Sequence, residues 1–147
     1  SKYVSLSRHL SGVIWVKNGH LYLGESKQTD MKKIQPEFAL QGYPRIVDPV
    51  NKMGIYKPGK NKAYRAAICT RQNEIILMIT NRWFGKISLH ELAEIAQAPV
   101  QQGGLACDIA INLDGGPAPA VSVDASISDL EIGAHWQLPN VIVVQAK

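Results

Sequence analysis

The feature that most constrains the fold of this chain is the apolar run CDIAINL at residues 107–113. Strands with one face in water alternate apolar and polar residues, whereas a continuous apolar run is typical of a strand buried on both faces. We therefore expect residues 107–113 to form a buried strand. The run ends in Asp114-Gly115-Gly116, so a carboxylate follows the strand beside a backbone that carries no side chains.

Two pairs of apolar runs predict β-hairpins. The segments GVIWV (12–16) and HLYLG (20–24) flank an Asn-Gly turn, which is typical of a tight hairpin. The segments AYRAAICT (63–70) and EIILMIT (74–80) are separated by Arg-Gln-Asn and form a second hairpin. Because its strands are strongly apolar, we expect this second hairpin to be central to the sheet.

The other segments before residue 88 are more polar. Residues 25–37 show no hydrophobic period and are predicted to be a loop. Residues 39–47 look extended, and Pro44 limits them to a sheet edge or a bend. Residues 48–62 contain two prolines, two glycines and four lysines, a composition that predicts an exposed excursion.

One helix is predicted at SLHELAEIAQA, residues 88–98. Ser88 can accept a hydrogen bond from the amide of Glu91 while the Glu91 side chain reaches back, which is the reciprocal capping box, and the apolar residues recur on one face. The last strands are expected at residues 119–123 and 140–146. The predicted fold class is therefore α+β, with a mixed, mostly antiparallel β-sheet packed by one principal helix.

The composition supports a single domain over residues 1–147 and disfavours several classes of protein. A chain of 147 residues that is 46% apolar can bury one sizeable core. Its net charge of +4 is spread too thinly for a nucleic-acid-binding arm, whereas an anionic small substrate or glycan would suit it. No apolar run approaches the roughly 18 residues of a transmembrane helix.

The cysteines and histidines do not indicate a metal site. Cys69 and Cys107 lie far apart and outside any zinc-binding spacing, and the four histidines are scattered. The two cysteines could form one disulfide or remain two buried thiols, and the sequence leaves both alternatives open. We expect neither a metal nor a cofactor.

The Asp114-Gly115-Gly116 sequence, taken alone, has two structural interpretations. It could be a plain Asp-Gly turn between two strands, because such dipeptides are common in turns. It could also display a catalytic carboxylate at the end of a sheet, where glycines let a ligand approach the backbone.

The surrounding segment GGLACDIAINLDGGPAPAV, residues 103–121, resembles the signature of the phosphodiester glycosidase family. In that signature a Gly-Gly-Leu turn leads through Asp-Ala-Leu-Asn-Leu-Asp-Gly-Gly to a small polar residue. Further segments are similar to family motifs in the same order, so that the resemblance covers roughly residues 12–146. These segments are ALQGYPRIVD (39–48), YRAAICT (64–70), SLHELAEIA (88–96) and LPNVIVV (138–144).

The resemblance implies hydrolysis of the bond between the anomeric carbon of a sugar and a phosphodiester oxygen. It implies a phosphorylated sugar or anionic glycan as the partner, and export to the periplasm, the cell envelope or the medium, as in bacterial relatives. Such chemistry needs a cation for the phosphate and a carboxyl group that assists departure or water attack. The implied roles are a catalytic Asp114 and a substrate- or phosphate-binding set of Arg65, Gln41, Asn112, Gly115 and Gly116.

Without the resemblance, each of these residues also has a structural interpretation. Arg65 could be a surface side chain, and Asn112 could either orient the catalytic carboxylate or satisfy a backbone group. Asp108 could supply a second carboxylate or serve only as a turn residue. Arg45 could bind anions or be solvated at an edge.

The chain departs from the family pattern at two places, and these departures leave two hypotheses about its function. Pro117 and Ala118 follow the glycines where the family usually has Ser or Thr, and residues 1–38 contain no counterpart of the family's upstream Asn-Gly-Gly-aromatic segment. We therefore expect either the C-terminal part of a phosphodiester glycosidase domain or a divergent member. The function is accordingly that of an exported glycosidase, or of a non-catalytic relative that binds an anionic glycan or a cell-envelope polymer.

Overall fold

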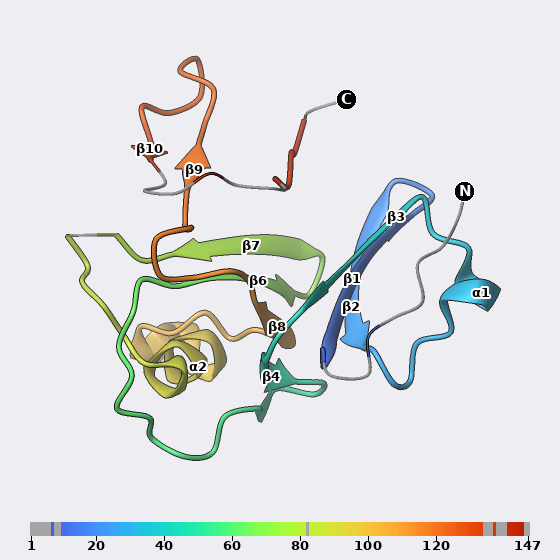
Figure 1. Cartoon of the computed structure of the whole chain (residues 1–147), viewed down its shortest axis with the longest axis horizontal. Helices are drawn as coiled ribbons and strands as arrows, with labels where there is room; N and C mark the ends of the chain where they lie inside the picture. Colours follow the sequence, from blue (N-terminus) through green and yellow to red (C-terminus); the bar gives the residue numbers. More distant parts are fainter. Residues whose placement is uncertain (1–6, 8–9, 82, 134–136, 138–140, 146–147) are drawn as a thin grey trace.

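The computed structural model describes residues 7, 10–81, 83–133, 137 and 141–145, and its elements are shown in Figure 1. It confirms the α+β class, with mostly antiparallel sheets and one principal helix. The helices are α1 (Met31–Ile34), α2 (Leu89–Gln97) and the 3-10 helix η1 (Val100–Gln102). The strands are β1 (Gly12–Lys17), β2 (His20–Glu25), β3 (Phe38–Gly42), β4 (Arg45–Asp48), β5 (Lys52–Met53), β6 (Ala66–Arg71), β7 (Glu74–Ile79), β8 (Ile109–Asn112), β9 (Val121–Ser122) and β10 (Glu131–Ile132).

A five-stranded sheet in the order β5-β4-β8-β6-β7 forms the centre of the molecule. Ala67, Cys69 and Ala110 on one of its faces pack in a core cluster that includes the buried side of α2. On the other face, Ile68 and Ile111 pack against Ile14 of the three-stranded sheet β2-β1-β3. Figure 1 shows α2 beneath β6 and β7, and β1–β3 to the right of β8.

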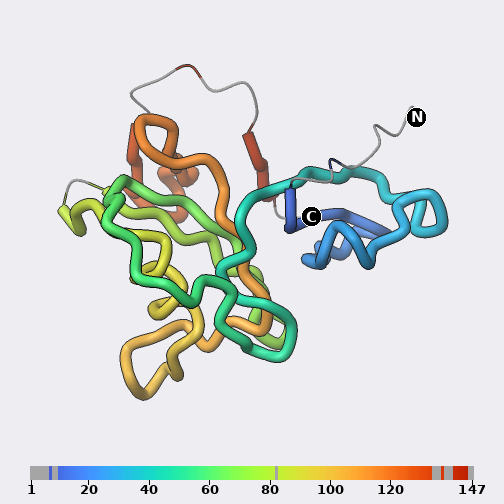
Figure 2. The backbone as a smooth tube through the Cα atoms, turned by 60° about the horizontal axis from the view of Figure 1, so that its bottom comes forward, coloured from blue at the N-terminus to red at the C-terminus, as the bar shows by residue number. Residues whose placement is uncertain are grey.

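Strand β8 is covered on both faces by these two clusters, and all four of its residues are buried. This confirms the buried strand that the continuous apolar run predicts. In Figure 2 the first three strands form a body at the right, joined to the rest of the chain by the segment between β3 and β4. That segment contains a cis peptide bond between Tyr43 and Pro44, which is the bend expected from the proline.

Both predicted hairpins form, but their places in the sheets differ from expectation. In the β1–β2 hairpin, Asn18 and Gly19 have φ values of 52° and 73°, as a tight primed turn requires. In the second hairpin, β6 lies between β8 and β7, whereas β7 is an edge strand. The expectation that both strands of this hairpin are central is therefore wrong for β7. Its apolar residues reflect the packing of one face on the core, and they do not indicate whether a second strand pairs with β7.

The principal helix begins and ends close to the predicted bounds. The Ser88 Oγ accepts a hydrogen bond of 3.1 Å from the Glu91 amide, and Glu91 Oε2 accepts one of 2.7 Å from the Ser88 amide. The capping box is thus confirmed at the N-terminus of α2. The last helical residue is Gln97, and Ala98 forms the C-cap before a proline.

Two local predictions are wrong. The segment 25–37, predicted to be a loop, contains the single-turn helix α1, because the Asp30 carboxylate accepts hydrogen bonds from the amides of Lys32 and Lys33. In the predicted last strand, residues 141–145 have no regular structure, and residues 140 and 146 lie outside the described residues. The strand expected at 119–123 is reduced to β9, which pairs with β10 and with no other strand among the described residues.

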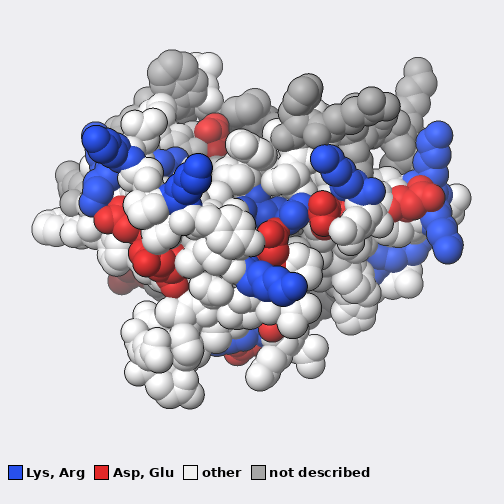
Figure 3. All heavy atoms as spheres, turned by 90° about the horizontal axis from the view of Figure 1, so that it is seen from below, with Lys and Arg blue, Asp and Glu red and all other residues white. Residues whose placement is uncertain are grey.

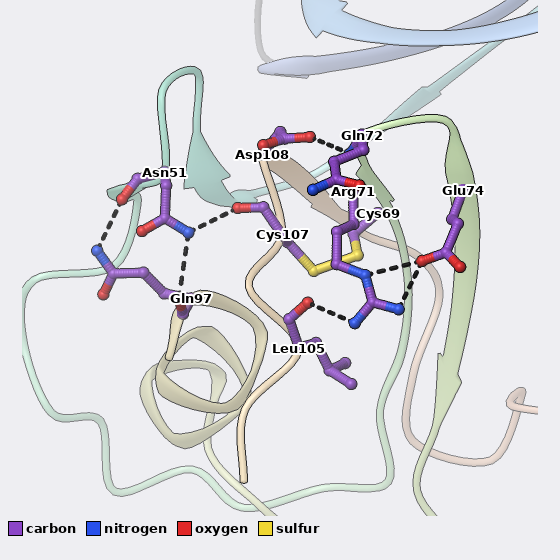
Figure 4. Close-up of a disulfide and its surroundings, with 9 residues drawn as sticks. All are labelled: Asn51, Cys69, Arg71, Gln72, Glu74, Gln97, Leu105, Cys107 and Asp108. Atoms are coloured by element: carbon purple, nitrogen blue, oxygen red, sulfur yellow. Dashed lines mark hydrogen bonds and ion pairs between the residues drawn. A yellow bond between two sulfur atoms is a disulfide. The ribbon is translucent and has the colours of Figure 1, made fainter. Parts of the chain in front are cut away.

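Cys69 and Cys107 form a disulfide, which resolves the alternative that the sequence leaves open. Their Cα atoms are 5.9 Å apart, and both residues are fully buried between α2 and the sheet. Figure 4 shows hydrogen bonds beside the bridge: Asn51 Nδ2 donates to the carbonyl oxygens of Cys107 and Gln97, and Gln97 Nε2 donates to the Asn51 carbonyl. The bridge and these bonds hold the start of β8 against β6 and the end of α2.

Candidate functional site

The antiparallel pairing of β6 with β8 places Arg65 and Asp114 at the same end of the two strands. Ala67 pairs with Asn112 in the antiparallel register, and the Leu113 amide donates a hydrogen bond of 2.8 Å to the carbonyl of residue 66. Beyond this bond the register shifts by one residue, since the amide of Gly116, and not that of residue 115, donates to the carbonyl of Tyr64 at 2.9 Å. Arg65 immediately precedes β6 and Asp114 follows β8 by two residues, so strand alternation does not assign their side chains to one face.

The two glycines allow the turn after Asp114 to approach the strand that carries Arg65. A Cβ atom on Gly115 would lie 2.8 Å from the carbonyl oxygen of Tyr64, closer than real Cβ contacts, and the same position is 3.9 Å from Arg65 Nη1. Gly116 has a φ of 67° and donates its amide to the Tyr64 carbonyl at 2.9 Å. Any side chain at position 115 would therefore push the turn away from the arginine.

The carboxylate of Asp114 is exposed and is oriented by the turn that follows it. Its Oδ1 atom accepts a hydrogen bond of 2.8 Å from the amide of Gly115. The other carboxylate oxygen, Oδ2, makes no hydrogen bond to the described residues. One oxygen of the carboxylate is thus fixed by the backbone, and the other is available to a ligand or a water molecule.

Arg65 is held by main-chain carbonyl groups. Its Nε donates to the carbonyl of Ile87 at 3.2 Å, and its Nη2 donates to the carbonyl of Asn61 at 3.0 Å. Within the described part of the chain, no carboxylate lies within ion-pair distance of this guanidinium. Partial burial lowers the pKa of Arg65 below its usual value through desolvation. The side chain therefore presents an oriented and uncompensated positive charge, with Nη1 toward the Asp-Gly-Gly turn.

Asn112 contacts the bend between β3 and β4. Its backbone amide donates to the carbonyl of Pro44 at 2.9 Å, and its side-chain Nδ2 donates to the carbonyl of Tyr43 at 2.8 Å. The side chain is 8% exposed, and its Oδ1 atom is buried without a hydrogen-bond partner among the described residues. Of the two roles considered for Asn112, the structure shows the one in which it satisfies a backbone group.

Gln41 is not brought together with Arg65 and Asp114. It lies on β3 of the three-stranded sheet, where its side chain accepts a hydrogen bond from the Ser7 amide at 2.7 Å and donates to Ser26 Oγ at 3.2 Å. The side chain thus holds the segment that precedes β1. Its predicted role in substrate or phosphate binding stays a prediction.

Two other charged residues that could have joined the site are also engaged elsewhere. Asp108 accepts a hydrogen bond of 2.6 Å from the Gln72 amide at the opposite end of β8 from Asp114, so it does not supply a second carboxylate (Figure 4). Arg45 Nε donates to Asp48 Oδ1 at 2.7 Å, and its Nη1 lies 3.6 Å from Glu25 Oε1. Asp108 is therefore a turn residue, and the charge of Arg45 is compensated.

Two shallow depressions lie beside Arg65 and the Asp-Gly-Gly turn, and both are lined by lysines. The sequence predicts only an exposed segment for the lysines of residues 48–62, and it does not single out Lys86. One, of about 330 Å³, contains Gly116, and the other, of about 300 Å³, contains Arg65. A clustering of four lysines between residues 48 and 62 is the signal that could have indicated them. The first is lined by Lys62, Ala63, Tyr64, Lys86, Gly116 and Pro117, and the second by Ile55, Lys57, Gly59, Lys60, Asn61, Arg65, Leu89 and His90.

Charged side chains are interspersed elsewhere on the surface. On the face seen in Figure 3, basic and acidic side chains lie near one another and form no continuous field of one sign. A group of three or more His, Cys, Asp or Glu side chains able to hold a metal ion does not occur among the described residues. None of the described helices combines the length and the apolar character needed to cross a bilayer.

Comparison with known proteins identifies the family. A search of curated proteins found no significant match. A family model described as phosphodiester glycosidase matches residues 3–145, which is nearly the whole chain and includes all the elements that place Arg65 and Asp114. The chain belongs to the phosphodiester glycosidase family.

Proposed function

We propose that this protein hydrolyses sugar-1-phosphate diesters, with Arg65 binding the phosphate and Asp114 acting on the anomeric carbon or on the attacking water. One observation carries the proposal: the two residues lie at the same end of neighbouring strands, and the bare backbone of Gly115, next to Asp114, leaves Arg65 Nη1 open toward the turn. A cation beside a carboxylate is the combination that this hydrolysis requires.

The chemistry of the leaving group gives Arg65 and Asp114 different roles in the reaction. A phosphate monoester departs as a stable anion, so a guanidinium that binds its oxygens stabilises the departing charge. Asp114 then acts in the attack on the anomeric carbon. It either takes the proton from an attacking water or attacks the anomeric carbon itself. The Oδ2 atom, which the turn leaves without a hydrogen bond, is the oxygen suited to this step.

A second candidate function is binding without catalysis. The chain has Pro117 and Ala118 where relatives usually carry a hydroxyl, and Asp108 lies at the far end of β8 from Asp114. Glycosidases commonly use two carboxyl groups. A site with one positioned carboxylate and one positioned arginine would still bind the phosphate groups of an anionic glycan.

Export is part of the proposal, and the disulfide supports it. Disulfides persist in oxidising compartments and are rare where thiols are kept reduced. The buried bridge between Cys69 and Cys107 would be stable in the periplasm, in the cell envelope or outside the cell. Phosphodiester-linked glycans at the cell surface would be accessible to the protein there.

The test compares Asp114→Asn with Arg65→Lys, and uses Asp129→Asn, an exposed aspartate in the C-terminal third, as the matched control. On a chromogenic sugar-1-phosphate diester, Asp114→Asn should lower kcat by at least about 10²-fold, because a general base or nucleophile is removed. Arg65→Lys should mainly weaken the affinity for phosphate-bearing ligands, because lysine cannot reproduce the fixed fork of the guanidinium.

Three outcomes separate the hypotheses. Loss of turnover in Asp114→Asn with retained ligand affinity supports hydrolysis. A wild type that binds sugar-1-phosphate without turnover, and loses that affinity in Arg65→Lys, supports the binding function. Unchanged affinity and turnover in both variants, with melting temperatures equal to that of the control, would contradict both the catalytic role of Asp114 and the phosphate-binding role of Arg65.

A further inference from the structure

Basic side chains gather in the depression that contains Arg65. Its lining includes Lys57, Lys60 and His90 together with Arg65, and no carboxylate. Lys57 and Lys60 belong to the exposed loop between β5 and β6, and both are exposed. The depression therefore combines three basic side chains with a histidine in a space of about 300 Å³.

The lysines of this loop differ in whether their charge is compensated. Lys62 Nζ lies 2.7 Å from Glu91 Oε1, and this hydrogen bond, with those from Ser88, lowers the pKa of Glu91 to about 2. Lys57 and Lys60, in contrast, have no carboxylate within ion-pair distance in the described part of the chain. Their positive charges are thus available to an anion that enters the depression.

Arg65 lies between this depression and the Asp-Gly-Gly turn. Its Nε and Nη2 donate to the carbonyls of Ile87 and Asn61, while Nη1 is 3.9 Å from the position that a Gly115 Cβ would take. An anion at Nη1 would therefore lie beside the backbone of Gly115, which follows Asp114, whereas Lys57 and Lys60 line the depression that also contains Arg65. Arg65 thus contributes to both the turn and the depression.

We propose that this depression binds a second anionic group of the ligand through Lys57 and Lys60, so that the protein prefers polyanionic, phosphate-bearing glycans to ligands with a single phosphate. The proposal rests on the proposed function for the position of the first phosphate. It adds two specificity-determining residues that do not take part in bond cleavage. The loop between β5 and β6 then contributes to the selection of the ligand.

The test uses inorganic pyrophosphate and orthophosphate as probes in titration calorimetry at constant ionic strength. The variant Lys57→Gln/Lys60→Gln removes two charges from the depression, and Lys32→Gln/Lys33→Gln removes two exposed charges from α1 as the matched control. Pyrophosphate affinity should fall about tenfold in the first pair and less than about twofold in the second, because each exposed charge contact is worth a few-fold in affinity. Orthophosphate affinity should change little in either.

The proposal is overturned if the wild type binds pyrophosphate no more tightly than orthophosphate. It is also overturned if both variant pairs lose pyrophosphate affinity equally, since net charge alone would then explain the loss. Equal melting temperatures establish that all three proteins are folded. Turnover of a sugar-1-phosphate diester is measured separately, so an inactive protein with lysine-dependent pyrophosphate binding would contradict the hydrolase assignment and support the second anion site.

Discussion

Removing the disulfide gives a perturbation whose magnitude follows from the position of the bridge in the chain. Cys69 and Cys107 are separated by 38 residues. In the chain-entropy model, closing a loop of that length lowers the entropy of the unfolded state enough to stabilise the fold by about 4 kcal/mol. Replacing both cysteines by alanine should therefore lower the free energy of unfolding by about 4 kcal/mol, a large share of the roughly 5–15 kcal/mol typical of a domain.

The assay is guanidinium-induced unfolding of the oxidised wild type and the double alanine variant, followed by far-ultraviolet circular dichroism. Because both sulfur atoms are fully buried, the variant also loses packing, so wild type treated with a reducing agent is measured as the control that keeps the sulfur volume. A loss of less than about 1 kcal/mol in both samples, or two free thiols in the native oxidised protein, would refute the reasoning.

Three further perturbations test the turn and the helix. Gly115→Ala should cost about 1–3 kcal/mol and weaken phosphate binding, because its Cβ would lie 2.8 Å from a carbonyl oxygen, whereas Gly133→Ala, with no atom within 4 Å, should be nearly neutral in thermal unfolding and in titration. Ser88→Ala should lower stability by about 1 kcal/mol without changing ligand affinity, and a loss of affinity at unchanged melting temperature would contradict its role as a cap. The pKa of Glu91, lowered from 4.5 to about 2 by the hydrogen bond to Lys62 and by those from Ser88, should give stability that is complete above about pH 4.5 and is lost as the pH falls toward 2. The melting temperatures of wild type and Glu91→Gln should therefore converge over that interval, and a constant difference would show that this carboxylate is not the titrating group.

The parts of the fold that the sequence predicts well are those decided by neighbouring residues. Asn18 and Gly19 adopt positive φ values because a two-residue hairpin needs them, and Ser88 and Glu91 satisfy amides within the same helical turn. The unbroken apolar run of β8 likewise reports its burial on both faces. Each of these signals lies within a few residues of the structure that it predicts.

The parts that the sequence does not predict depend on contacts between distant segments. Nothing near Gln41 indicates that its side chain binds Ser7, and nothing in β7 indicates that it is an edge strand in the described part of the chain. The same holds for the candidate site. Each of Arg65 and Asp114 can be proposed from its own sequence neighbours, but their position at the same end of two strands follows only from the pairing of β6 with β8.

The disulfide and the Asp-Gly-Gly turn lie at the two ends of β8, and this arrangement restricts which changes in chain length the family can accept. Only residues 108–113 separate Cys107 from Asp114. Because side chains alternate along a strand, the deletion of one of them, with the bridge intact, would turn the following residues of β8 to the opposite face and displace the Asp-Gly-Gly turn. Relatives that keep the bridge and the activity should therefore show no insertion or deletion in this interval, whereas the loop between β5 and β6 can vary in length and so diversify the ligands that are bound.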